Sequence, residues 1–280
     1  MIGGDSAEGV GLLSAIVLGI VEGLTEFLPV SSTGHLILAQ RWLGIAEGEA
    51  SSVFVIGIQM GAITAILVLY WRRLLGALGT AFQRSAAGPN LLWQIAIAAL
   101  PAAIVGLLAD DWIDAHLMSP TVVAITMVLG GVLLLWLERW QARARVPTRE
   151  LGGVSYSTVL GIGLFQCLAL LPGTSRSAAT IGGGMLLGLS RQAAAEFSFL
   201  VGLPILYGAS LHSLVKHRSA LAGDALVPFL VGLLVAFLTA LVVVRPFVQF
   251  LRAHTFAIFA WYRIVVGVGL LLLAAVGALG

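Results

Sequence analysis

Long runs of apolar residues dominate this chain, and their length most limits the folds open to it. Six runs, at about 52–71, 90–109, 119–140, 192–214, 225–247 and 255–277, are close to the roughly 20 residues that a helix needs to cross a bilayer. The chain is 59% hydrophobic and 10% charged, with a mean hydropathy of +1.04, whereas soluble domains carry about 25% charged residues. The sequence therefore predicts an all-α integral membrane protein and excludes a soluble enzyme.

Other compositional features exclude further classes. The single cysteine, Cys167, rules out an internal disulfide and is too isolated for a metal cluster. The first eight residues lack a basic region, so we expect no cleaved signal peptide. The sequence has no basic patch of the kind that binds nucleic acid, so we expect no nucleic-acid partner.

Four shorter helical segments complete a prediction of ten. Residues 9–28 form a helix that Pro29 stops, and 32–44 form a second that is too short to span. Residues 154–171 and 175–188 repeat this plan around Pro172. We expect each pair to be a re-entrant helical hairpin, because non-helical backbone at membrane depth needs protein or a wet cavity around it.

The two halves of the chain resemble each other. Pro29 and Pro172 are 143 residues apart, as are Phe54 and Phe197, and this offset places Arg176 where the first half has Thr33. Each half, 1–145 and 146–280, has one hairpin and three spans. Because three is odd, the second half must be inserted upside down, which predicts an inverted-topology repeat.

The basic residues agree with this topology. Ten would lie on the inner side and three on the outer side, as the positive-inside rule requires. The inner set is Arg72, Arg73, Arg84, Arg139, Arg143, Arg145, Arg149, Arg191, Arg245 and Arg252, and the outer set is Arg41, Lys216 and Arg218, beside acidic loops at Glu47–Glu49 and Asp110–Asp114. Both termini would then face outward.

Two acids lie in the first hairpin. Glu22 and Glu26 share a helical face, and charges at bilayer depth are costly enough to suggest function. Their oxygens suit a divalent cation, Mg²⁺ or Ca²⁺. The alternative is a buried pair that shares a proton.

The second hairpin supplies a cation. Arg176 stands between Ser175 and Ser177, and its guanidinium fork matches phosphate oxygens. The alternative is a structural ion pair with Glu22 or Glu26, and both roles are compatible.

Hydroxyls and a histidine follow the first proline. His35 shares a helical face with Ser31 and Ser32 and could serve as general acid, base or phosphate donor. Ser32 is the best nucleophile candidate, although the sequence leaves a serine nucleophile and an activated water open. N-capping alone would explain any one of five hydroxyl residues: Ser31, Ser32, Thr33, Thr174 and Ser175.

Further polar residues lie within or near the spans. Arg263 is deep in the last span and is predicted to bind substrate. Glu196 is expected to pair with Arg191 near the inner surface, and Gln59 and Gln166 are weaker candidates.

These motifs resemble those of a known family. EGLTEFLPVSSTGH (22–35) and PGTSRS (172–177) look like the two signatures of the bacterial undecaprenyl-diphosphate phosphatases, also called bacitracin-resistance proteins. The resemblance covers nearly the whole chain, including residues 196–199 and 261–263. One departure is Ala178, where the family usually has glycine and where a methyl group would crowd the hairpin tip.

The resemblance implies an activity. The chain would hydrolyse undecaprenyl diphosphate to undecaprenyl phosphate and phosphate, recycling the carrier lipid for peptidoglycan synthesis in the bacterial cytoplasmic membrane. It would depend on a divalent cation and open its site to the outer leaflet. The site residues carried over are Glu22, Glu26, Ser32, His35 and Arg176 for catalysis, Glu22 and Glu26 for metal, and Ser31, Thr33, Thr174, Ser175, Ser177 and Arg263 for substrate.

Two rival functions were weighed. A flippase or secondary transporter uses the same inverted-repeat architecture, but the crowding of acids, histidine, hydroxyls and arginine favours an enzyme. An acid-phosphatase-like lipid phosphatase needs a nucleophilic histidine soon after its Ser-Arg motif, and here none follows Arg176 until His212. The sequence leaves open which metal binds, which prenyl chain length is preferred and whether undecaprenyl phosphate is also flipped. It also leaves open the oligomeric state, for which a homodimer is one candidate.

Overall fold

A computed structural model describes residues 10–46, 48–81, 89–144, 150–151, 153–219, 221 and 223–276, without the side chains of Asp110, Asp114 and Ala144. Some predictions fall outside these residues. They are the expectation that no signal peptide is cleaved, the boundary between residues 145 and 146, and the placement of Glu47, Arg84, Arg145 and Arg149.

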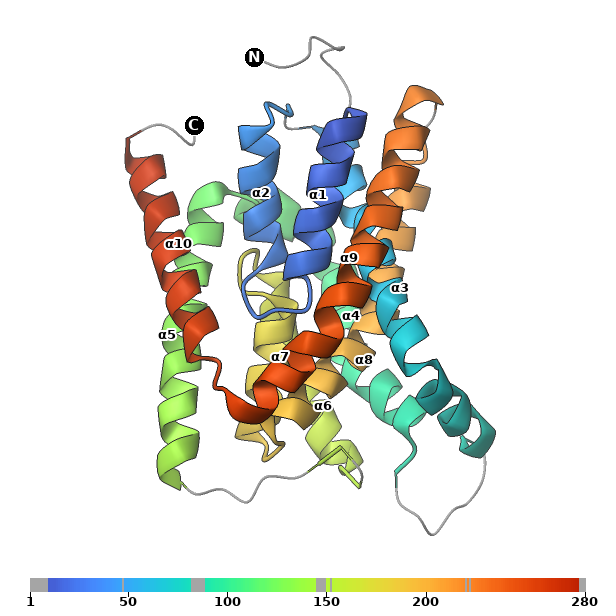
Figure 1. The fold of residues 1–280 in the computed structure, drawn as a ribbon, viewed down its shortest axis with the longest axis vertical. Helices are drawn as coiled ribbons and strands as arrows, with labels where there is room; N and C mark the ends of the chain where they lie inside the picture. Colours follow the sequence, from blue (N-terminus) through green and yellow to red (C-terminus); the bar gives the residue numbers. More distant parts are fainter. Residues whose placement is uncertain are drawn as a thin grey trace.

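The described chain is all helical, with ten α-helices as predicted (Figure 1). In order they are α1 (Leu12–Thr25), α2 (Ser32–Trp42), α3 (Glu49–Thr80), α4 (Leu91–Leu117), α5 (Pro120–Ala144), α6 (Tyr156–Gln166), α7 (Arg176–Leu186), α8 (Arg191–Lys216), α9 (Leu226–Ala253) and α10 (Ala257–Ala275), with short 3₁₀ helices η1 (Cys167–Leu170) after α6 and η2 (Gly223–Ala225) before α9.

Six of these helices are long and apolar enough to cross a membrane, namely α3, α4, α5, α8, α9 and α10. They coincide with the six predicted spans. Several run further than the apolar pattern suggested: α3 continues past Arg72 and Arg73 to Thr80, and α4 continues to Leu117. Helical geometry continues there because no proline interrupts either extension.

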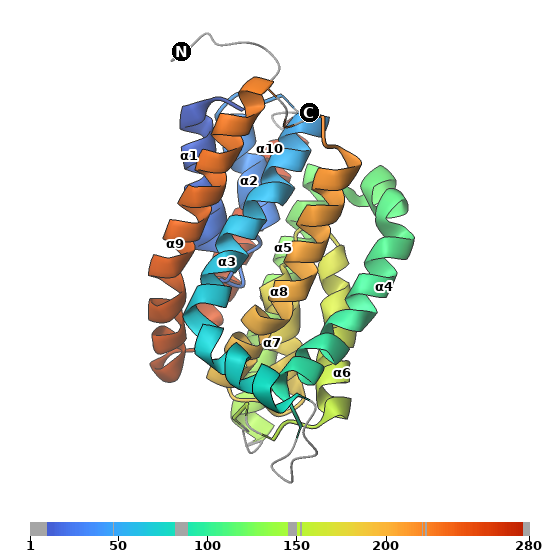
Figure 2. The ribbon, with the colours of Figure 1, turned by 90° about the vertical axis from the view of Figure 1, so that its right-hand side faces the viewer.

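The four short helices form two pairs that enter from opposite ends of the molecule. Figures 1 and 2 show the loop between α1 and α2 at mid-height, facing the loop between α6 and α7. Helix α1 has 14 residues and the other three have 11, all below spanning length. Helix α1 ends at Thr25, a turn earlier than predicted, because the residue before Pro29 is disfavoured from helical geometry.

Close packing holds these short helices in place. Helix α1 packs along α9, and α6 packs along α4. Gly23 makes the first contact possible, because a Cβ there would lie 2.6 Å from the carbonyl oxygen of Ala236. The core continues behind the first loop, where Phe27 packs edge to face against Phe199 of α8, with their ring centroids 5.2 Å apart.

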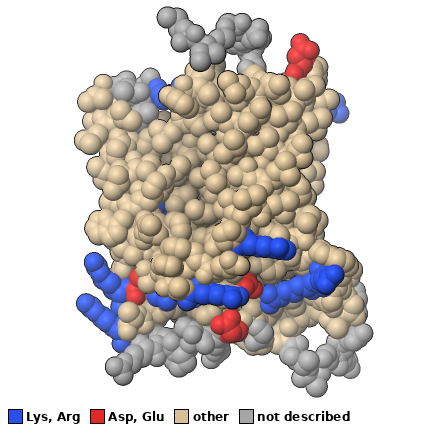
Figure 3. Space-filling view, viewed as in Figure 1, with Lys and Arg blue, Asp and Glu red and all other residues tan. Residues whose placement is uncertain are grey.

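Basic residues form a band at one end of the molecule (Figure 3). The described members lie at the ends of α3, α5, α8 and α9, whereas Arg41, Lys216 and Arg218 lie at the other end, as predicted. The predicted pairing of Glu196 with Arg191 is wrong. Glu196 forms an ion pair with Arg73 of α3 at 3.1 Å, and Arg191 donates hydrogen bonds to Glu138 of α5. Each of the two α8 residues therefore pairs with a residue of a neighbouring helix.

Candidate active site

The two facing loops start their second helices in the same way. Ser31 and Ser175 both have φ of +72° and cap the helices that follow, accepting from Gly34 N at 3.3 Å and Ala178 N at 3.2 Å. Left-handed backbone is uncommon for a non-glycine residue and costs free energy that the surroundings must offset. The free N–H groups at the N-termini of α2 and α7 lie where the two loops face each other, at mid-height of the molecule (Figure 1).

This geometry corrects the predicted correspondence between the halves. The equivalent caps, Ser31 and Ser175, are 144 residues apart, so Arg176 corresponds to Ser32 and not to Thr33. The extra residue lies between Pro172 and Ser175, where Gly173 takes a φ of +86° that favours glycine.

Three predicted site residues meet across the loops. The Ser32 hydroxyl donates to Glu26 Oε2 at 2.7 Å, and Arg176 Nη2 lies 3.1 Å from Glu26 Oε1. All three side chains are almost fully buried. An acid of one loop thus joins a hydroxyl of its own loop to the guanidinium of the other.

The far side of Arg176 is fixed by α8. Its Nη1 donates to the Ser198 carbonyl oxygen at 2.7 Å, and Thr180 donates to the Ser198 hydroxyl at 2.6 Å. A Cβ at Gly202 would lie 2.8 Å from the Arg176 guanidinium carbon, so glycine leaves room for it. Sequence reasoning missed Ser198, Thr180 and Gly202, because nothing local marks the part of α8 that faces Arg176.

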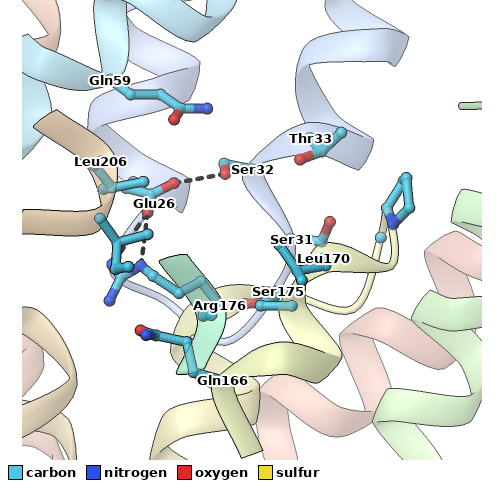
Figure 4. A pocket seen from close by; sticks show the side chains of 15 residues that line it. Glu26, Ser31, Ser32, Thr33, Gln59, Gln166, Leu170, Ser175, Arg176 and Leu206 are labelled. Atoms are coloured by element: carbon cyan, nitrogen blue, oxygen red, sulfur yellow. Dashed lines mark hydrogen bonds and ion pairs between the residues drawn. The ribbon is translucent and has the colours of Figure 1, made fainter. Parts of the chain in front are cut away.

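A cavity of about 180 Å³ lies beside this contact. Its polar wall includes Thr33, Gln59 and Gln166, and Figure 4 shows the Glu26–Arg176 contact between the two glutamines. Its apolar wall comes from α4, η1 and α8 through Ala102, Ala169, Leu170, Ile205 and Leu206. Drug-sized ligand sites measure about 300–1,000 Å³, so only a small polar group fits inside.

Glu22 lies one turn before Glu26 and is completely buried. Both carboxylate oxygens of Glu22 lack a hydrogen-bond partner. The carboxylate interacts electrostatically with Glu26 and Arg176. The described residues hold no group of three or more His, Cys, Asp or Glu that could bind a metal. The unpartnered oxygens still fit a hard cation, because buried carboxylates need a compensating charge.

The hydrogen bonds of His35 go to residues other than Ser32. Its Nδ1 lies 2.7 Å from the Ser31 carbonyl oxygen, and its Nε2 lies 2.7 Å from the Tyr262 hydroxyl. Because a carbonyl only accepts, Nδ1 carries a proton and donates it to Ser31, while Nε2 shares a hydrogen bond with the Tyr262 hydroxyl. The residue Tyr262 was missed as a site residue.

Arg263 links the two loops by hydrogen bonds. It is fully buried, does not line the cavity, and donates to Pro29 O at 3.3 Å and Gly173 O at 3.1 Å, one carbonyl from each loop. Two further bonds reach the carbonyls of Thr126 and Met127 on α5.

The remaining predicted residues lie around the loops. Ser177 donates to the Leu28 carbonyl oxygen at 2.9 Å and contacts Ser175, while Thr174 donates its backbone N–H to Leu171. The methyl group of Ala178 is accommodated in a small apolar cluster with Leu134 and Ala260.

Proteins similar to this chain are named for one activity. Undecaprenyl-diphosphatase 1 of Chromobacterium violaceum is 47% identical over 256 residues, covering 91% of this chain and 94% of that protein. The undecaprenyl-diphosphatase of Acidovorax ebreus is 48% identical over 266 residues, covering 94% and 95%. Undecaprenyl-diphosphatase 1 of Oenococcus oeni is 41% identical over 272 residues, covering 95% and 98%.

A family model described as "Bacitracin resistance protein BacA" matches residues 15–269, which include both loops, Arg263, five of the six long helices and most of α10. With these relatives and this match, the chain belongs to the bacitracin resistance protein family.

Proposed function

We propose that this protein is a membrane phosphatase that hydrolyses undecaprenyl diphosphate to undecaprenyl phosphate and phosphate, and so recycles the carrier lipid for cell-wall synthesis. The observation that carries the proposal is the hydrogen-bonded series Ser32–Glu26–Arg176 in a buried cavity. The names of the relatives point to the same reaction.

In the membrane, the two pairs of short helices act as re-entrant hairpins of an inverted repeat. Exchanging the halves turns the packing of α1 on α9 into that of α6 on α4 and leaves the α3–α8 and α5–α10 contacts unchanged. The band of basic residues faces the cytoplasm by the positive-inside rule. The protein is then a multi-pass protein of the bacterial cytoplasmic membrane, with its active site open to the outer side.

Ser32 is the nucleophile and Glu26 its general base. The Ser32 oxygen attacks the terminal phosphorus, its proton passes to Glu26, and the bridging P–O bond breaks so that the electron pair leaves on the lipid phosphate. The hydrogen bond of 2.7 Å between Ser32 and Glu26 supports this assignment. Water then hydrolyses the phosphoserine, and Ser32 recovers its proton from Glu26.

Positive charge at the site supports phosphoryl transfer, which depends chiefly on positioning and charge stabilisation. Arg176 binds phosphoryl oxygens once substrate displaces part of its contact with Glu26, aided by the N-termini of α2 and α7 and by Thr33 and Ser175. A divalent cation held by Glu22 and Glu26 would neutralise further charge on the diphosphate.

His35 and Arg263 position the loops. The Nδ1–H of His35 holds the carbonyl of Ser31, whose strained backbone sets the direction of Ser32. Arg263 holds both loops from behind.

The small cavity also limits how substrate binds. It takes the diphosphate, while the prenyl chain leaves past the apolar wall of α4, η1 and α8 into the bilayer. We therefore expect a soluble, short prenyl diphosphate to serve as an assay substrate.

The test is phosphate release by purified protein in detergent. Wild type should release phosphate from a short prenyl diphosphate, and Glu26→Gln and Arg176→Ala should abolish release. Glu196→Gln, an acid of α8 outside the cavity, is the matched control and should retain it. Movement of labelled lipid phosphate across vesicles without release would indicate a transporter and contradict the proposal.

A further inference from the structure

One polar atom at the cavity has no role in the mechanism above. Gln166, at the end of α6, is 1% exposed and lines the cavity, and its Oε1 has no hydrogen-bond partner. Its Nε2 lies 3.4 Å from the Ala98 carbonyl oxygen. Because a carbonyl only accepts, this contact fixes which end of the amide is which.

An unsatisfied buried acceptor destabilises a protein, so the orphaned oxygen points to a donor that arrives in the working enzyme. The other unpartnered atoms among the described residues belong to Glu22 and Gln141, and neither residue lines the cavity. Gln166 Oε1 is thus the orphaned acceptor at this cavity.

The Glu26 carboxylate at this cavity already has hydrogen-bond donors, unlike Gln166 Oε1. Both oxygens of Glu26 already accept, one from Ser32 and the other from Arg176. A diphosphate brings more acceptors and no strong donor. Water brings two O–H donors, and a cavity of about 180 Å³ has room for it beside a phosphate, since one water needs only about 30 Å³ of liquid volume.

We propose that Gln166 Oε1 accepts a hydrogen bond from the water that completes hydrolysis and aims it at the phosphorus. Figure 4 shows Ser32 beside Glu26 and Gln166 near Arg176, toward the two ends of the Glu26–Arg176 contact. Attacking and leaving oxygens lie roughly in line in phosphoryl transfer, so the proposal requires this water to reach the phosphorus from the side opposite Ser32. This inference rests on the proposed phosphatase function.

The proposed step balances. The water oxygen bonds to phosphorus, the bond between phosphorus and the Ser32 oxygen breaks, and Glu26 returns the serine proton. Both water protons leave on the phosphate, and Gln166 takes none. During attack, one O–H of the water donates a hydrogen bond to Gln166 Oε1 and the other donates to a phosphoryl oxygen.

This arrangement predicts selectivity for water over alcohols. Methanol has a single O–H, which cannot serve Gln166 and a phosphoryl oxygen at once. In wild type we expect little methyl phosphate when methanol is added to the assay. In Gln166→Leu, which keeps the size but removes the acceptor, the ratio of methyl phosphate to phosphate should rise several-fold.

Turnover and trapping give a second readout. Gln166→Leu should lower kcat about 100-fold, the scale of a misplaced reactant, with little change in KM, and phosphoserine should accumulate at Ser32. Gln166→Glu keeps an acceptor oxygen at the same reach and should recover part of the rate. Gln141→Leu, the matched control, removes another buried glutamine outside the cavity and should change neither quantity.

The outcomes separate this inference from the proposed function. An unchanged product ratio in Gln166→Leu, at any rate of turnover, overturns the role of Gln166. A wild type that releases no phosphate overturns the phosphatase itself. A raised ratio without phosphoserine in either protein supports the water site and overturns the serine route.

Discussion

Replacing Arg263 by methionine should uncouple the two loops without altering the cavity wall. Four hydrogen bonds would be lost, but Thr126 O and Met127 O lie within α5 and retain intrahelical donors. Pro29 O and Gly173 O lie in the loops and would lose the Arg263 donor. At about 1–3 kcal/mol for each unsatisfied buried acceptor, we expect a loss of about 2–6 kcal/mol.

Thermal unfolding of the purified protein in detergent measures this loss. At about 2 °C per kcal/mol for a large domain, Tm should fall by about 4–12 °C. Activity below Tm should fall through kcat, with KM little changed, because the loops no longer align Ser32 with Arg176. Arg263→Lys should not rescue it, since one ammonium cannot reach both loops.

The control is Arg252→Met, which removes an exposed arginine whose guanidinium bonds Gln192 at 3.1 Å near the end of α9. It should leave Tm and kcat unchanged. An Arg263→Met protein with normal Tm, normal kcat and a raised KM would refute this linking role and support the sequence-based prediction that Arg263 binds substrate.

Three substitutions and one chelation test other parts of the account. Arg176→Lys keeps the charge but loses the fork that contacts Glu26, so phosphate release should fall about 100-fold. Tyr262→Phe keeps the ring stacked on His35 but loses the hydroxyl, and kcat should fall about 2- to 10-fold. Gly23→Val places a side chain against α9 and should lower the free energy of unfolding by about 1–3 kcal/mol, read as a lower Tm. Chelation with EDTA should stop release, and Mg²⁺ or Ca²⁺ should restore it; unchanged rates with EDTA would contradict the metal role of Glu22.

Much of the fold was predictable because the bilayer allows few solutions. Spanning length identified the six long helices, and Pro29 and Pro172 identified the two loops. The meeting of Glu26 with Arg176 was also predictable, since a charge at that depth needs a partner.

What sequence missed depends on contacts between distant helices. An offset measured from the prolines misaligned Arg176 by one residue, because Gly173 adds a residue to the second loop. The hydrogen bond between Tyr262 and His35 joins residues on α10 and α2, and no local pattern encodes it. The orphaned oxygen of Gln166 likewise follows from the packing of α6 on α4.

The central claim is that Ser32, activated by Glu26 and facing Arg176, takes up the phosphoryl group. Brief turnover with a substrate labelled on its terminal phosphate, followed by acid quench and peptide mapping, tests it most directly. The account predicts label on Ser32 in wild type, more label in Gln166→Leu and none in Arg176→Ala. Full phosphate release with no label on Ser32 in either active protein would contradict it.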